Sequence, residues 1–170
     1  MQIIDNFLPD KEFKNIQDTL LNGDFPWFFT EFKIINDGDT RIDVDELYNF
    51  QFTHTLYDQL GPRSKYIETL APILEKLNPS AISSIKANIT PITPKLMTYG
   101  YHTDTNITNG YTGVYYINSN NGVTVFENGD VVESKENRML IFNSMLKHSG
   151  TSCTDQKVRC VINFNFYKWE

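Results

Sequence analysis

The feature that most limits how this 170-residue chain can fold is the alternation of apolar and polar residues from about Ala81 onward. Such alternation is typical of strands with one buried face, because successive side chains point to opposite faces of a sheet. Clusters rich in Asn and Gly, such as 119–122 and 127–130, separate the runs and indicate turns. Many short strands at this spacing predict a β-sandwich or a barrel-like jelly roll. The predicted strands are Ser84–Thr90, Lys95–Tyr101, Tyr111–Asn118, Val123–Glu127, Val131–Glu133, Met139–Asn143 and Val158–Trp169.

The first third of the chain is predicted to be helical and irregular. Asp10 is a candidate N-cap for a helix that stops at Gly23, and the apolar residues between them fall on one helical face. A second helix is expected to begin at Ser64 and to be kinked or split by Pro72. Helices first and strands afterwards indicate an α+β fold with the helices packed on one sheet. We therefore expect a single domain over residues 1–170, with 1–80 as helical support and 81–170 as the jelly-roll core.

Composition and charge argue against several classes of function. A formal net charge of −6 without a cluster of Lys and Arg disfavours nucleic-acid binding, because phosphate contacts need such clusters. No apolar run approaches the ~20 residues of a membrane span, and no signal peptide is visible. The two cysteines, Cys153 and Cys160, lack zinc-site spacing and are expected to be reduced thiols. We expect a cytoplasmic protein without membrane or nucleic-acid partners, and the sequence indicates no oligomeric state.

Two histidines and an aspartate have the spacing of a metal site. His102 and Asp104 are two residues apart, so on a strand they project to the same side. His148 follows 44 residues beyond Asp104, and Arg159 stands eleven residues later. Two imidazoles and one carboxylate with open positions form the ligand pattern of non-heme Fe(II) oxygenases. Taken alone, a His-x-Asp match is weak evidence, and the remaining histidine, His54, is assigned to structure or to support of the site.

The predicted strand that contains Arg159 has one polar face. Arg159, Val161, Asn163 and Asn165 share this face, and Cys160 begins the apolar one. In an ordinary half-buried strand the polar face meets water. In a jelly roll whose interior is a ligand cleft, the polar face points inward instead. Periodicity does not choose between these two arrangements.

Six segments carry a resemblance to a known family: Tyr101–Asp104, Tyr111–Asn118, Gly122–Phe126, Leu140–Asn143, Lys147–Gly150 and Arg159–Asn163. Together they resemble the Fe(II)/2-oxoglutarate-dependent dioxygenases, most closely the prolyl-4-hydroxylase-like branch. The stretch Ile3–Pro9 is similar to the opening of this branch, and the richness in Asn, Ile and Lys suits an AT-rich genome such as a phage's. The sequence departs from the family where Gly122-Val123 replaces a common Gly-Gly and Thr90 a common Tyr.

The resemblance implies a double-stranded β-helix, which is a jelly roll with iron at one open end. It implies His102, Asp104 and His148 as the metal ligands at the catalytic centre. It also implies Arg159 as the cation that grips the distal carboxylate of 2-oxoglutarate, a task that suits its planar, permanently charged fork. The implied cofactors are Fe(II), 2-oxoglutarate and O2, with ascorbate as a further candidate. Weaker candidates for contacts with the cosubstrate are Tyr116, Asn163 and Asn88.

The activity implied is hydroxylation of a substrate, with release of succinate and CO2. Asp104 favours hydroxylation, because the related halogenases lack this carboxylate and hold chloride in its place. The substrate is left open between a prolyl residue of a peptide, another side chain and a small metabolite. The segments Asp37–Asp45 and Asp104–Tyr111 are candidates for selecting it. Two alternatives are a non-catalytic jelly-roll binding module that retains the pocket and a structural zinc site, for which no fourth ligand is evident.

Overall fold

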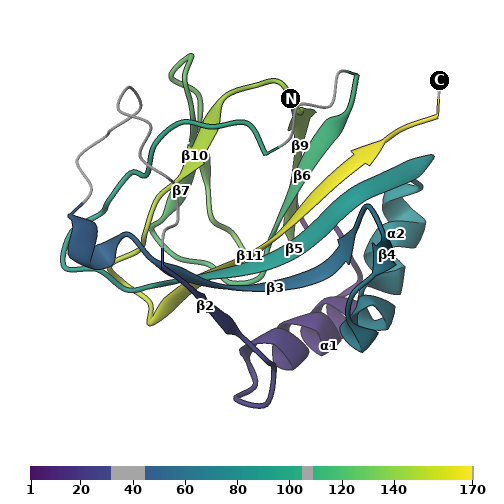
Figure 1. Ribbon diagram of the computed structural model, residues 1–170, viewed down its shortest axis with the longest axis horizontal. Coiled ribbons are helices and arrows are strands. Elements are labelled where there is room, and N and C mark those ends of the chain that lie inside the picture. Colours follow the sequence, from purple (N-terminus) through teal and green to yellow (C-terminus); the bar gives the residue numbers. More distant parts are fainter. Residues whose placement is uncertain (32–44, 105–108, 170) are drawn as a thin grey trace.

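Two antiparallel sheets dominate the computed structural model, which describes residues 1–31, 45–104 and 109–169 (Figure 1). Most of the acidic segment 37–45 and of the loop after Asp104 lies outside the described residues. The large sheet contains, in spatial order, β1 (Gln2–Ile4), β9 (Arg138–Asn143), β6 (Tyr111–Tyr116), β11 (Val158–Tyr167), β5 (Ala81–Pro91), β3 (Gln51–Asp58) and β2 (Phe28–Thr30), with β4 (Gly61–Pro62) beside β3. The small sheet contains β10 (His148–Gly150), β7 (Val123–Phe126) and β8 (Val131–Glu133).

The chain folds as a double-stranded β-helix, as predicted, and its helices cover one face of the large sheet (Figure 1). Helix α1 (Asp10–Leu21) has Pro9 at its N-cap, so Asp10 is the first helical residue and the predicted Asp10 cap is wrong. The 3₁₀ turn η2 (Lys65–Leu70) leads into α2 (Ala71–Leu77). The predicted second helix is split into η2 and α2 at Pro72, as expected. Pro72 lies in the first turn of α2, where its missing N–H costs no hydrogen bond. A third short turn, η1 (Glu46–Tyr48), precedes β3. In the described part of the chain, no helix is long and apolar enough to cross a membrane.

The two faces of β11 lie in different surroundings. Cys160, Ile162 and Phe164 belong to the core between the large sheet and the helices, together with Ile16 of α1 and Ile73 of α2. The opposite face points between the two sheets. There, a smaller apolar cluster fills one end of the interior: Val114, Tyr116, Phe126, Val132, Leu140, Phe142 and Val161. The rest of this inner face is polar and lines a cavity, so the polar face of the Arg159 strand points inward.

Several local predictions differ from the structure. The segment Lys95–Tyr101 is not a strand, and Thr98 makes only an isolated bridge, to Thr151. Part of its backbone bonds to a side chain: the Met97 amide donates to the Ser152 hydroxyl at 2.9 Å, whereas the Met97 carbonyl accepts from the Ser152 amide. The first third is not only helical and irregular, because β3 pairs along much of its length with β5. β1 and β2 likewise pair with β9 and β3.

Asn137 joins the N-terminal segment to the jelly roll. It is buried with φ +57°, its side-chain oxygen accepts from the Leu8 amide and the Tyr115 hydroxyl, and its amide group donates to the Leu8 carbonyl. We expect Asn137→Ala to lower the free energy of unfolding by about 3 kcal/mol, because three hydrogen bonds are lost and alanine is strained at positive φ. Denaturant unfolding measures this change. The exposed Asn109 has φ 64°, so Asn109→Ala reports strain alone and should cost about 1 kcal/mol; equal losses in both variants would contradict the role of Asn137.

Candidate metal and anion site

A reciprocal backbone bridge places the two histidines side by side. The amide of His102 donates to the carbonyl of His148, and the amide of His148 donates to the carbonyl of His102, each at 3.0 Å. The two ring centroids are 4.9 Å apart. The ring of Phe142 packs edge-on against His148 with 4.7 Å between centroids and restricts its rotation. The pairing of β10 with the segment before Asp104 therefore fixes both imidazoles without help from a ligand.

Each imidazole presents the same ring nitrogen to the centre of the site. Nδ1 of His102 lies 3.1 Å from the carbonyl oxygen of Gly100, and Nδ1 of His148 lies 3.1 Å from that of Leu146. A carbonyl can only accept, so both Nδ1 atoms carry the proton and a neutral ring keeps its lone pair on Nε2. Metal-binding histidines are typically oriented by such a bond to the second nitrogen.

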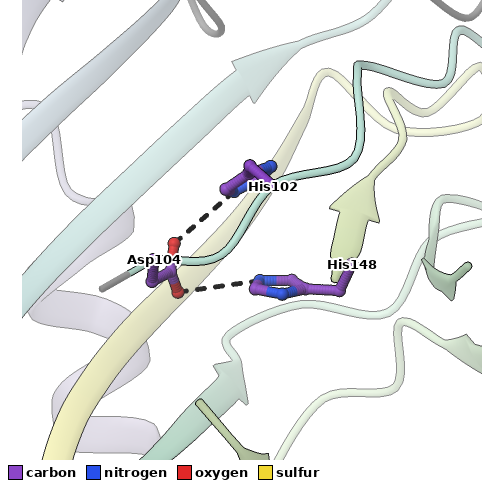
Figure 2. A group of neighbouring side chains, drawn as sticks. All are labelled: His102, Asp104 and His148. Atoms are coloured by element: carbon purple, nitrogen blue, oxygen red, sulfur yellow. Dashed lines mark ion pairs between the residues drawn. The ribbon is translucent and has the colours of Figure 1, made fainter. Parts of the chain in front are cut away.

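Asp104 completes the group and faces both Nε2 atoms (Figure 2). Its Oδ1 lies 3.5 Å from Nε2 of His102, and its Oδ2 lies 3.6 Å from Nε2 of His148. Candidate ligand atoms of the three residues lie within 4.8 Å of one another, and Oδ2 is buried without a hydrogen-bond partner. Burial raises the pKa of Asp104, but hydrogen bonds and charge from the two imidazoles, when these are protonated, lower it well below its ordinary value.

This arrangement suits a divalent cation. Two neutral imidazoles would turn lone pairs toward a carboxylate, and acceptors that face one another are unfavourable unless a cation lies between them. Two nitrogens and one oxygen make a mixed donor set of the type used by non-heme iron. No fourth Cys, His, Asp or Glu ligand joins the group among the described residues, so the set differs from a closed structural zinc site.

Arg159 is a buried cation in the same cavity. Its side chain donates from Nε to the Ser134 hydroxyl at 2.9 Å and from Nη2 to the Thr124 hydroxyl at 3.2 Å. Within the described residues, no carboxylate lies within ion-pair distance of its guanidinium. Burial lowers the pKa of Arg159. A buried charge without a counterion is costly, so the geometry suits a bound anion.

Two glycines make room for this guanidinium. A Cβ at Gly122 would lie 2.7 Å from Cδ of Arg159 and 2.5 Å from the Ser152 carbonyl oxygen. A Cβ at Gly150 would lie 3.2 Å from Nη1 of Arg159. The backbone at Gly122 and at Gly150 therefore lies close to the Arg159 side chain.

The cavity that is lined by His102, Asp104, His148 and Arg159 has a volume of about 270 Å³. This is slightly below the roughly 300–1,000 Å³ of pockets for drug-sized ligands, and it suits a small molecule. Asn88 and Asn163 also line it, and each has a buried side-chain oxygen without a donor. Tyr116 does not line the cavity but contacts two residues that do. Its hydroxyl donates to the Thr124 hydroxyl at 2.7 Å, and its ring centroid lies 5.7 Å from the guanidinium carbon of Arg159.

Sequence reasoning missed four residues around the cavity. Thr124 and Ser134 orient Arg159, and Lys86 and Gln51 line the walls. Lys86 could have been found, because it lies two residues before Asn88 on the same face of β5. Ser134 follows a strand and carries no local signal of its role. His54 stays outside the site, where its Nδ1 lies 2.6 Å from the Pro26 carbonyl oxygen among aromatic rings.

Neither known protein families nor curated proteins contain a match to this sequence. Solved structures do match over almost the whole chain. A prolyl hydroxylase from Trichoplax adhaerens, solved with a peptide fragment of a hypoxia inducible factor oxygen degradation domain, has a TM-score of 0.63 and 15% identity, covering 98% of this chain and 83% of that one. A prolyl-4-hydroxylase from Pseudomonas putida has a TM-score of 0.57 and 13% identity, covering 99% and 92%.

A third match has a different chemistry. The non-heme α-ketoglutarate-dependent epimerase SnoN from nogalamycin biosynthesis has a TM-score of 0.64 and 11% identity, covering 98% of this chain and 75% of that one. At these identities the likeness is one of fold. The chain thus shares the double-stranded β-helix of prolyl hydroxylases and of other non-heme 2-oxoglutarate-dependent enzymes.

Proposed function

We propose that this protein is an Fe(II)- and 2-oxoglutarate-dependent dioxygenase. One observation carries the proposal: two imidazoles and a carboxylate, a group that suits a cation, lie in the same small cavity as a buried guanidinium, which suits an anion. A ligand that chelates a metal at one end and carries a carboxylate at the other would satisfy both. 2-Oxoglutarate has this form. The fold shared with 2-oxoglutarate-dependent enzymes supports the same assignment.

His102, Asp104 and His148 would hold the iron, which supplies the activation of O2 when it is bound. The Nδ1 bonds to the carbonyls of Gly100 and Leu146 orient both rings so that each Nε2 would be directed at the metal. Three protein ligands leave positions open for the cosubstrate and for oxygen. Asp104 fills the carboxylate position, which favours hydroxylation over halogenation.

Arg159 would bind the distal carboxylate of 2-oxoglutarate, and Thr124 would assist it. The Thr124 hydroxyl oxygen accepts from both Tyr116 and Arg159, so its own proton is available to donate into the cavity. Tyr116 would act through Thr124 by fixing the direction of that proton. Asn88 and Asn163 would serve as polar wall residues, whose open acceptors suit a water or a substrate donor better than a dicarboxylate, which only accepts.

The reaction that this site supports best is hydroxylation of an aliphatic carbon, with release of succinate and CO2. We propose a prolyl residue in a peptide as the first substrate class to test. Two neighbours in fold are prolyl hydroxylases, and one of them was solved with a peptide bound. The chain would supply position and a shielded cavity, while iron and oxygen supply the oxidising power.

The proposal is tested by measuring succinate formation with Fe(II), 2-oxoglutarate and O2, first alone and then with a panel of proline-containing peptides. We expect succinate only when all three components are present, and a higher rate with a peptide that is a substrate. Calorimetry under nitrogen, with Mn(II) in place of Fe(II), measures cosubstrate binding separately. Binding without any succinate would favour the non-catalytic binding module, and absence of both would contradict the proposal.

A further inference from the structure

A polar groove leads away from the metal site along the inner face of the large sheet. Three cavities share Asp104 in their walls. The first is the cavity with Arg159, and the second shares Lys86 and Asn163 with it. The third continues from the second at Ser84 and Asp58, toward the turn between β3 and β4. Together they form a continuous path from the metal ligands to the outer end of β5.

Alternate residues of three neighbouring strands line the second of these cavities, which we call the outer groove. Lys86 of β5 is paired with Asn163 of β11 on one side and with Thr55 of β3 on the other. One step further, Ser84 is paired with Asn165, and the two side chains are hydrogen-bonded at 3.1 Å. At the β6–β9 end, the same inner face is packed with apolar residues. The polarity of the outer groove is therefore local and suits a polar ligand.

The charges in the outer groove leave one cation without a partner. Asp58 is already neutralised, because Arg63 donates to it at 2.6 Å and the Leu60 amide at 2.8 Å, and these bonds lower its pKa. Asp104 faces the metal position. The ammonium of Lys86 has no carboxylate within ion-pair distance among the described residues, and its side chain is exposed to the groove.

Lys86 is displaced from Arg159 along the sheet. Arg159 is paired with Thr90, and Asn163 with Lys86, so four residues separate the two positions along the sheet. At about 3.3 Å per residue this is about 13 Å between backbone positions. In the proposed function one carboxylate of 2-oxoglutarate lies at Arg159 and the other at the metal. A further anionic group, received by Lys86 in the outer groove, would come from the substrate.

We propose that the substrate binds in the outer groove and that Lys86 receives a carboxylate of that substrate. This inference rests on the proposed function and adds the class of substrate. Asn163 would contribute its open side-chain oxygen to an N–H or O–H group nearer the metal. The carboxylate can be the terminus of a small acid or peptide, or an acidic side chain beside the oxidised residue. The shared requirement is one negative charge within reach of Lys86.

The test uses protein loaded with Zn(II) and 2-oxoglutarate and two matched pairs of probes. N-acetyl-L-proline is compared with N-acetyl-L-prolinamide, and acetyl-Pro-Asp-amide with acetyl-Pro-Asn-amide. We expect the acid of at least one pair to bind about fivefold more tightly than its amide, with saturable NMR shifts of the Lys86 side chain. Preference within the first pair indicates a terminal carboxylate, and preference within the second an acidic side chain.

Three variants decide the role of Lys86. Lys86→Met should reduce the ratio of acid to amide affinity to about one, and Lys86→Arg should retain it. Lys157→Met is the matched control, because Lys157 is exposed, directly precedes β11 and lines none of the three cavities. Equal affinities in the unaltered protein, or a ratio that survives Lys86→Met, would overturn the inference alone. Failure of the zinc-loaded protein to bind 2-oxoglutarate would overturn the proposed function and the inference with it.

Discussion

Arg159→Met is expected to weaken 2-oxoglutarate binding by about thirtyfold or more. Removing one partner of a buried, hydrogen-bonded charge pair typically costs about 2–5 kcal/mol, because the other charge remains buried without its counterion. The effect should fall on the cosubstrate and leave the metal affinity nearly unchanged, since Arg159 makes no contact with the three metal-site residues among its hydrogen bonds. Calorimetry with Mn(II)-loaded protein under nitrogen measures both affinities.

The same substitution should not destabilise the ligand-free protein. Arg159 carries a buried charge without a carboxylate partner among the described residues, so replacing it by an apolar side chain of similar length removes a desolvation cost. We expect the melting temperature of the free variant to equal or exceed that of the parent. A variant that melts earlier and binds 2-oxoglutarate normally would show that Arg159 is structural.

Two controls separate charge from shape. Arg159→Lys keeps the charge but loses the planar fork, so we expect an intermediate affinity. Arg63→Met removes an exposed guanidinium that pairs with Asp58, and it should leave cosubstrate binding unchanged. Comparing the 2-oxoglutarate affinities of Arg159→Met and Arg63→Met then shows how much the buried position of the Arg159 guanidinium contributes to binding.

The parts of this protein that could be predicted from sequence depend on local periodicity. Alternation over β5, β6 and β11 is long enough to identify the strands. The two faces of β11 differ in polarity because one packs in the apolar core and the other lines the polar cavity. His102 and Asp104 could be paired because a separation of two residues fixes their common side. The inward direction of Arg159 and Asn163 could not be read from the strand alone, since it depends on the second sheet.

The parts that escaped prediction depend on partners distant in sequence. β10 has three residues, and it is defined by pairing with β7 and by the bridge to His102. Lys95–Tyr101 has the alternation of a strand, but its neighbours offer it side-chain hydroxyls instead of a continuous ladder. Ser134 contacts Arg159 across 25 residues of sequence and a change of sheet. No local pattern specifies such contacts.

Asp104→Asn is expected to abolish succinate formation and to weaken divalent-metal binding by more than about a hundredfold. Losing a second-sphere partner of a metal ligand typically costs ten- to a hundredfold, and in the proposed site Asp104 would be the anionic ligand itself. The amide keeps the shape of the side chain, so the loss can be assigned to charge. Titration with Mn(II), followed by the rise in melting temperature with metal concentration, measures the affinity.

The metal-free protein should respond in the opposite direction. The Asp104 oxygens face two Nε2 atoms at 3.5 and 3.6 Å, and in neutral rings these atoms are also acceptors. An asparagine amide can donate to one Nε2 and remove that conflict, so Asp104→Asn should melt at least as high as the parent without metal.

Asp18→Asn, on the exposed face of α1, is the matched control and should keep the stabilisation by Mn(II). If the Asp104 variant is instead destabilised without metal and still binds Mn(II) normally, the carboxylate holds the two histidine segments together and is not a metal ligand. If Asp104→Asn is more stable than the parent without metal and no longer binds Mn(II), the result supports Asp104 as a metal ligand.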